Sequence, residues 1–299
     1  MLSKIKRYTT VLSPVICLLL LVLCSSASIE GAKTGLSLWA NVIVPTLLPF
    51  IILTNLMIYG KTLPALANHA IIKKYQPCVI LSIVVGFLCG YPMGGKFVND
   101  LYVGGFLDKQ LANLLLVLCN NASPMFIIGY VIHYGLCDSV SPVIVFGLLY
   151  IPNIVLFLCR YVRYAKRQNK AADFHLNTNP RSLPEIIKQS IDSVLLIGAY
   201  IMLFSILTAL VKQYARGLFL LPVASLEITV GISLLKNTVM LPAHRTALIL
   251  ALTAFGGCSS IAQTKSVANA KELSFLSYTL WKLFLACITG VLTLYFGTS

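Results

Sequence analysis

Two amides and a hydroxyl, Asn120, Asn121 and Ser123, lie with Pro124 in the middle of the apolar run Leu111–His133. Such groups are costly at membrane depth unless they face protein, water or a ligand. The proline removes a helix donor and clashes one turn back, so we predict a transmembrane helix that breaks at its centre. The three side chains can donate hydrogen bonds, and the helix resumed after the break presents free N–H groups. Together these groups form a candidate binding site.

A second crossing, Arg245–Gln263, carries a similar interruption. Its later part reads FGGCSSIAQ (Phe255–Gln263), a run of small and polar residues inside an apolar segment. The break is marked by Gly256 and Gly257, and its hydrogen-bond donors are Ser259, Ser260 and Gln263. The glycines have an alternative role as close contacts between packed helices.

The apolar run Val79–Gly95 is short for a full crossing, which needs about 20 residues. Gly90, Tyr91 and Pro92 form a turn signal within it. We therefore predict that residues 79–104 form a re-entrant hairpin with its tip at the turn, the alternative being a short transmembrane helix. The Tyr91 ring can stack on an aromatic substrate. Lys96 follows the tip and either pairs with a substrate carboxylate or extends to the membrane surface.

Glu227 is the single acid in the apolar segment Gly217–Leu235. An unpaired charge in a membrane is costly, so Glu227 should be paired, protonated or in contact with water. It is a candidate for coupling a proton or a sodium ion. The alternatives are a salt bridge to Lys236 or Arg216, or exposure at the interface. Residues 217–240 are therefore either a second re-entrant hairpin or a spanning segment.

The composition defines the class of protein. The 299 residues are 58% hydrophobic and 11% charged, with mean hydropathy +0.87, whereas soluble domains carry roughly 25% charged residues. The chain is therefore predicted to be an all-α polytopic membrane protein. The net charge of +14 comes from basic residues clustered between apolar runs. This distribution indicates cytoplasmic loops rather than a nucleic-acid surface.

Metal chemistry and catalysis have no sequence support. The nine cysteines include no CxxC pair, and the four histidines are scattered, so neither a disulfide framework nor a metal centre is expected. The residue sets of intramembrane proteases are missing, and so is a Walker A motif. We expect no enzyme activity and no cofactor apart from a coupling ion.

The order of segments repeats along the chain. Leu36–Tyr59, the first hairpin, the first broken helix and Pro142–Cys159 form one half. Ser190–Val211, the Glu227 segment, the second broken helix and Phe275–Phe296 form the other. If both middle segments are re-entrant, each half crosses three times and the second half is inverted. Interrupted segments at matching positions of inverted halves indicate a transporter site near the midplane.

The predicted organisation has about seven transmembrane helices and two re-entrant hairpins. Residues 1–35 hold a transmembrane helix or a signal segment around Val11–Leu23. Residues 36–160 and 190–299 are the two repeats, joined by the basic cytoplasmic loop 161–189. Four basic residues fall on the predicted outer side, against the positive-inside rule: Lys212, Arg216, Lys236 and Arg245.

The segment Gly86–Gly129 resembles the YlbJ (SpoVV) family of sporulation integral membrane proteins, within the nucleoside-recognition or Gate-domain superfamily. The matching elements are G-Y-P-x-G-x-K at Gly90–Lys96 and C-N-N-x-x-P at Cys119–Pro124. LWANVIVPTLLPF (Leu38–Phe50) and FGGCSSIAQ are also similar to the family.

The resemblance implies a fold like that of concentrative nucleoside transporters, in which two re-entrant hairpins and two unwound helices enclose the substrate. It implies transport of dipicolinate from the mother cell across the outer forespore membrane. Glu227 resembles the acid at the second hairpin tip of the nucleoside transporters, although the motif around it differs. We therefore expect a secondary transporter or facilitator of a small organic anion in a multi-pass membrane protein.

The expected partners are that anion and membrane lipid, with no nucleic acid, and a homo-oligomer remains open. The alternatives are a transporter of nucleosides or other small metabolites, and a structural membrane protein of sporulation that transports nothing.

Overall fold

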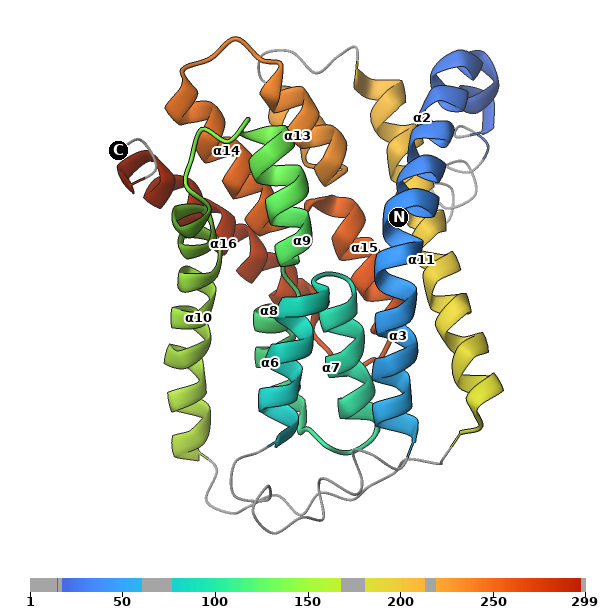
Figure 1. Cartoon of the computed structure of the whole chain (residues 1–299), viewed down its shortest axis with the longest axis vertical. Helices are drawn as coiled ribbons and strands as arrows, with labels where there is room; N and C mark the ends of the chain where they lie inside the picture. Colours follow the sequence, from blue (N-terminus) through green and yellow to red (C-terminus); the bar gives the residue numbers. More distant parts are fainter. Residues whose placement is uncertain (1–14, 16–17, 61–76, 168–180, 213–218, 297–299) are drawn as a thin grey trace, which may run out of the picture.

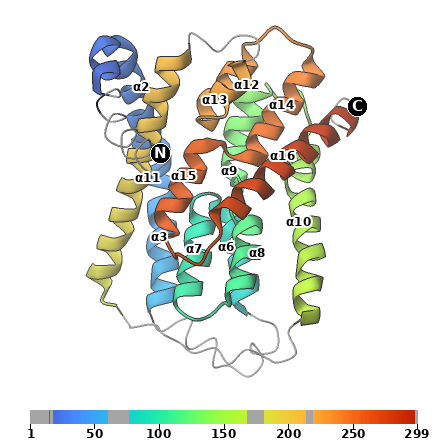
Figure 2. The same cartoon turned by 180° about the vertical axis from the view of Figure 1, so that it is seen from behind.

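The computed structural model describes residues 15, 18–60, 77–167, 181–212 and 219–296, and these contain helices and no strand (Figures 1 and 2). Five helical stretches are long and apolar enough to cross a membrane. They are Lys109–Gly135, Pro142–Lys166, Leu183–Val211, Pro242–Val267 and Phe275–Phe296. The prediction of an all-α polytopic membrane protein is thus confirmed. The predicted first crossing, Val11–Leu23, lies partly outside the described residues, and its described part, 18–23, is helical and exposed.

The helix that contains the predicted crossing Leu36–Tyr59 begins before Leu36. We expected a crossing from Leu36, but α2 (Ser25–Leu38) continues through the π-helical turn η1 (Trp39–Ile43) into α3 (Val44–Tyr59). The extension packs on α11 (Leu183–Val211). A β-carbon on Gly31 or Gly35 would meet the α11 backbone at 2.7 or 2.8 Å. The two glycines therefore let the helix axes approach closely.

The first hairpin has the predicted form. α6 (Pro77–Cys89) and α7 (Met93–Val103) pack together, with their turn at Gly90–Pro92. Both helices lie in the lower half of the molecule in Figure 1, and the turn points to its middle. Gly90 adopts φ +71°, a left-handed conformation that glycine tolerates, which lets the chain reverse there.

The second hairpin enters from the opposite end. α12 (Leu220–Ala224) and α13 (Ile228–Lys236) lie in the upper half of Figures 1 and 2, and residues 225–227 connect them. Gly231 of α13 lies directly against the carbonyl group of Ala224, where a β-carbon would overlap it. The short α12 therefore packs tightly on its partner helix.

Both crossings break where the sequence predicts. α8 (Lys109–Cys119) stops before residues 120–123, and the helix resumes as α9 (Pro124–Phe126) and the π-helical η2 (Ile127–Gly135). α14 (Pro242–Phe255) is separated from α15 (Gly257–Val267) by Gly256, with φ +87°. Figure 1 shows the two crossings running in opposite vertical directions. α10 (Pro142–Arg167) and α16 (Phe275–Phe296) follow them.

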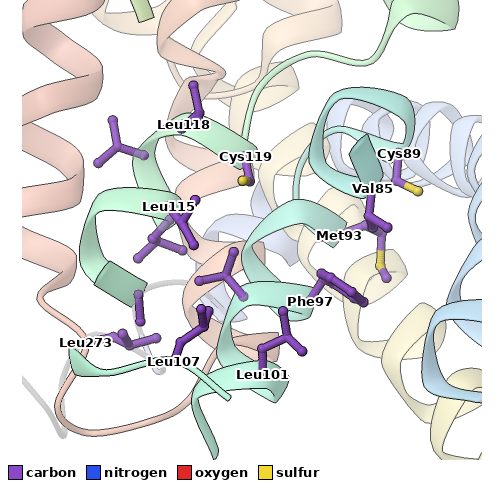
Figure 3. Close-up of a cluster of buried hydrophobic side chains, with 14 of the residues drawn as sticks. Val85, Cys89, Met93, Phe97, Leu101, Leu107, Leu115, Leu118, Cys119 and Leu273 are labelled. Atoms are coloured by element: carbon purple, nitrogen blue, oxygen red, sulfur yellow. The ribbon is translucent and has the colours of Figure 1, made fainter. Parts of the chain in front are cut away.

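The end of α8 lies between the two arms of the first hairpin. Cys119 is fully buried, and β-carbons built on Gly86 of α6 and Gly94 of α7 would both overlap its backbone. Figure 3 shows the surrounding core, in which Val85, Met93 and Leu118 lie around Cys119. This core fills the lower half, and a second cluster joins η2, α10, α13 and α14 above it. The glycines therefore fix the hairpin against the first break.

The close approach at Gly94 gives a prediction with a matched control. Gly94→Ala should destabilise the protein by about 1–3 kcal/mol, because the added methyl group overpacks the Cys119 contact. Gly129→Ala, where a β-carbon meets nothing within 4 Å, should be neutral or stabilising by up to about 1 kcal/mol. Thermal unfolding of the detergent-purified variants measures both. Equal melting temperatures for the two variants would refute the tight contact.

Candidate functional site

Each hairpin tip is hydrogen-bonded to the break of the crossing that follows it. At the first tip, the Tyr91 amide donates to the Asn121 carbonyl at 2.7 Å. At the second, the amides of Cys258 and Ser259 donate to the carbonyls of Ser225 and Leu226 at 2.8 and 2.9 Å. The tips therefore satisfy backbone groups that the breaks leave without helical partners.

Asn120 joins the two halves of the chain. Its side-chain oxygen accepts from the Gly95 amide at 3.2 Å. Its amide nitrogen donates to the Thr264 hydroxyl at 2.8 Å and to the Tyr278 hydroxyl at 2.6 Å. The residue is fully buried. One side chain at the first break thus contacts the first hairpin, α15 and α16.

Two further carbonyl groups at the first break have side-chain donors. The Leu118 carbonyl accepts from the side-chain amides of Asn121 and Asn153, and the Ala122 carbonyl accepts from the Tyr150 hydroxyl at 2.8 Å. The Ser123 hydroxyl accepts from the Phe126 amide and caps the resumed helix. Polar side chains therefore replace the lost helical bonds around the break.

Lys282 of α16 places a buried amino group at this break. Its ammonium donates to the Asn121 side-chain oxygen at 2.9 Å and to the Asn120 carbonyl at 3.0 Å, and the residue is only 1% exposed. Both partners are neutral. Within the described part of the chain, no carboxylate lies within ion-pair distance of Lys282. Lys282 is missing from the predicted site residues, because these were selected at turns and helix breaks. The signal that could have found it is a lone lysine inside the apolar run Phe275–Phe296.

Lys96, the cation predicted near the first tip, has a different environment. Its ammonium lies 2.5 Å from an Asp100 carboxylate oxygen and 3.0 Å from the Asn55 side-chain oxygen. Asn55 in turn donates to the Ser190 hydroxyl of α11. Lys96 is 3% exposed, so it does not extend to a surface. In this conformation it ties the hairpin to α3, and its charge is compensated.

The polar side chains of the second break bond mainly within α15. Gln263 donates to the Ser259 hydroxyl at 2.7 Å, and the Ser260 hydroxyl donates to the Gly257 carbonyl at 3.1 Å. The Thr264 hydroxyl, which receives the Asn120 amide, donates to the Ser260 carbonyl. Ser259, Ser260 and Gln263 are all buried.

Tyr91 and Glu227 approach the second break from the two hairpin tips. The Tyr91 ring lies 3.4 Å from a β-carbon placed on Gly256, and a β-carbon on Gly257 would lie 3.7 Å from the Glu227 backbone. The buried Tyr91 hydroxyl has no hydrogen-bond partner among the described atoms. A buried polar atom without a partner indicates a place for a ligand or a water molecule.

The Glu227 carboxylate caps α13. It accepts from the Val230 amide at 2.9 Å and from the Thr229 hydroxyl, and the residue is 3% exposed. It forms no salt bridge with Lys236, whose ammonium lies over the Tyr134 ring at 4.2 Å. Arg216, the other proposed partner, lies outside the described residues. The described residues also contain no cluster of three potential metal ligands.

The hydrogen bonds at the first break predict a measurable effect. Tyr150→Phe leaves the Ala122 carbonyl without its donor and should lower stability by about 1–3 kcal/mol, because an unsatisfied buried acceptor is costly. The ring contact with Phe87, at 4.7 Å, remains in the variant. Tyr295→Phe removes a hydroxyl from an 80% exposed residue and should change nothing. A Tyr150→Phe melting temperature equal to that of the control would contradict this role.

Comparison with known proteins gives one informative similarity. The chain is 25% identical to the sporulation integral membrane protein YlbJ of Bacillus subtilis (strain 168), over an alignment of 304 positions that covers 86% of this chain and 74% of the relative. No family model and no solved structure matches the chain. The alignment spans most of the sequence, well beyond the motifs at the first tip and break. This similarity supports the assignment of the chain to the YlbJ family of sporulation integral membrane proteins.

Proposed function

We propose that this membrane protein is a secondary transporter or facilitator of a small organic anion. The observation that carries the proposal is the buried Lys282 ammonium, which has only neutral oxygen partners at the first break. Burying an ion without a counter-charge costs several kcal/mol. A substrate carboxylate bound beside Lys282 supplies that counter-charge, whereas a neutral substrate does not.

The arrangement of elements supports a transporter. α3, the first hairpin, the first broken crossing and α10 have counterparts, in the same order, in α11, the second hairpin, the second broken crossing and α16. The hairpins enter from opposite ends, and the broken crossings run in opposite directions (Figure 1). This order supports an inverted repeat of the kind found in concentrative nucleoside transporters, with the site between the hairpin tips. Alternating access is then a movement of the hairpins around that site.

The proposed substrate is dipicolinate, a small aromatic dicarboxylate, moved across the outer forespore membrane. Three features support it. The relative in Bacillus subtilis is named as a sporulation protein. Lys282 offers a cation for a carboxylate, and the Tyr91 ring and unpartnered hydroxyl offer a stacking surface and a donor. The protein's own residues bind and orient the anion, with no covalent chemistry and no cofactor. Glu227 is the candidate for carrying a coupling proton or sodium ion.

One observation favours a second substrate class. Glu227 is buried at the second hairpin tip, a position that resembles that of the acid in nucleoside transporters. A nucleoside presents hydroxyl donors to a carboxylate and needs no cation. Lys282 distinguishes the two, because it lies unpaired at the opposing break.

Reconstituted protein distinguishes the substrates directly. We load proteoliposomes with unlabelled dipicolinate or, separately, with unlabelled nucleoside and add the same compound in labelled form outside. We expect counterflow of dipicolinate and none of nucleoside, because only the anion compensates Lys282. Nucleoside counterflow without dipicolinate counterflow would replace the proposed substrate. If folded protein shows counterflow of neither dipicolinate nor nucleosides, the transporter proposal is wrong and a structural role is favoured.

Lys282→Met tests the cation itself. Loss of a charge-assisted contact should weaken apparent dipicolinate affinity about 10- to 100-fold. The same change removes a buried charge without a counter-charge, but it also leaves the Asn120 carbonyl without its Lys282 donor. These opposed effects should keep the change in thermal stability small. Lys271→Met, an exposed lysine between α15 and α16, is the matched control and should behave as wild type. Wild-type affinity in Lys282→Met would exclude the lysine from the site.

A further inference from the structure

A cavity of about 280 Å³ lies between two pairs of helical elements, α2 and α11 on one side and η2 and α13 on the other. On the side of η2 and α13, its lining includes four polar side chains: Tyr130, Tyr134, Thr229 and Ser233. In Figure 1, α2 and α13 lie in the upper half, and α11 runs from the lower end up to α2. The cavity is separate from the site at the breaks, because it contains none of the residues that contact Asn120 or Lys282.

A row of aromatic rings leads from the first hairpin tip to this cavity. Tyr91 meets Phe126 edge to face, with centroids 6.5 Å apart. Phe126 stacks on Tyr130 at 5.4 Å, and Tyr130 lies 4.9 Å from Tyr134. The last two rings line the cavity. The row therefore joins the central site to the cavity with surfaces on which an aromatic ring can stack.

At this wall of the cavity, hydrogen bonds join η2 to α13 of the second hairpin. The Tyr130 hydroxyl donates to the Thr229 carbonyl at 2.8 Å, and the Tyr134 and Ser233 hydroxyls lie 3.0 Å apart. The Thr229 hydroxyl donates to the Glu227 carboxylate. A movement of the second hairpin therefore changes the cavity and the environment of Glu227 together.

Two lysines lie in or next to the lining of the cavity. Lys212 lines it, and the Lys236 ammonium lies over the Tyr134 ring. Glu30 is the acid in the lining. Two of the four basic residues that break the positive-inside rule are thus placed here. The positive-inside rule does not explain these two lysines, whereas attraction of an anion to the cavity would.

A polar atom without a partner supports a ligand in the cavity. Ser205 of α11 is 2% exposed and lines the cavity, and its hydroxyl has no hydrogen-bond partner among the described atoms. A serine or threonine hydroxyl within a helix can donate a hydrogen bond to the carbonyl one turn back, as Ser190 and Thr208 do in the same helix. Ser205 retains a free donor at the cavity wall.

We propose that this cavity is a second binding site for a small aromatic carboxylate, on the route between the upper end of the protein and the central site. The inference rests on the proposed function, since it assigns an entry site to the same substrate. Lys212 and Lys236 attract the anion, the Tyr130 and Tyr134 rings stack on it, and the Ser205 hydroxyl donates to its carboxylate.

Filling the cavity is the direct test. Thr34 of α2 is exposed and lines the cavity, so Thr34→Trp should obstruct it and Thr34→Ala should not. In proteoliposomes, counterflow of labelled dipicolinate should fall about tenfold or more in Thr34→Trp, because a packed indole ring blocks the passage of the substrate through the cavity. It should stay within about twofold of wild type in Thr34→Ala. Melting temperatures of the two variants show that both are folded.

A charge test does not depend on filling the cavity. The double variant Lys212→Gln and Lys236→Gln should raise KM for the dicarboxylate about 3- to 10-fold and reduce its salt dependence, with little change in maximal rate. Lys166→Gln, at the lower end of α10 in Figure 1, should leave KM unchanged. Wild-type KM in the double variant, or full counterflow in Thr34→Trp, would overturn the second site while the central site stands. Absence of flux in the wild-type protein would instead remove the proposed function.

Discussion

A helix that stops inside a membrane leaves carbonyl and amide groups that lipid cannot satisfy, and this constraint explains most of the structure. At the first break, the missing partners come from three other elements. The first hairpin tip donates its Tyr91 amide, α10 donates from Asn153 and Tyr150, and α16 donates from Lys282. At the second break, the second hairpin tip accepts from the amides of Cys258 and Ser259. The hairpins are therefore part of the solution to the breaks, and a hairpin that moves must exchange these bonds for others, with water or a substrate.

Close packing follows from the same constraint. A hairpin tip reaches a break at backbone distance only if no side chains intervene, so Gly86, Gly90 and Gly94 lie where the first hairpin meets residues 119–123. The second hairpin uses Gly231 against Ala224, and the second break uses Gly257 against the hairpin turn. The glycines that could have been ordinary helix contacts are thus concentrated where a tip and a break approach each other.

The local chemistry of the sequence predicts the breaks and turns well, because proline, glycine and paired amides disrupt a helix wherever they occur. The first hairpin and the two breaks appear at the expected residues. The partners of the breaks are not predictable in this way. Asn120 contacts Thr264 and Tyr278 across more than 140 residues, and no local pattern specifies such a pair. Lys96 is an intermediate case, since Asp100 lies one helical turn away and the sequence alone permits their ion pair.

The two buried lysines differ in whether a neighbouring acid balances their charge. Lys96 and Lys282 have nearly the same burial, and each donates to an asparagine side chain. Lys96 also has Asp100, so its charge is balanced whether or not a ligand is present. Among the described residues, Lys282 has no acid within ion-pair distance, so the described part of the protein does not balance its charge. A fold selected only for stability would replace such a lysine with an apolar residue, because unpaired burial gains nothing. The proposed anion would supply the missing counter-charge during part of a transport cycle.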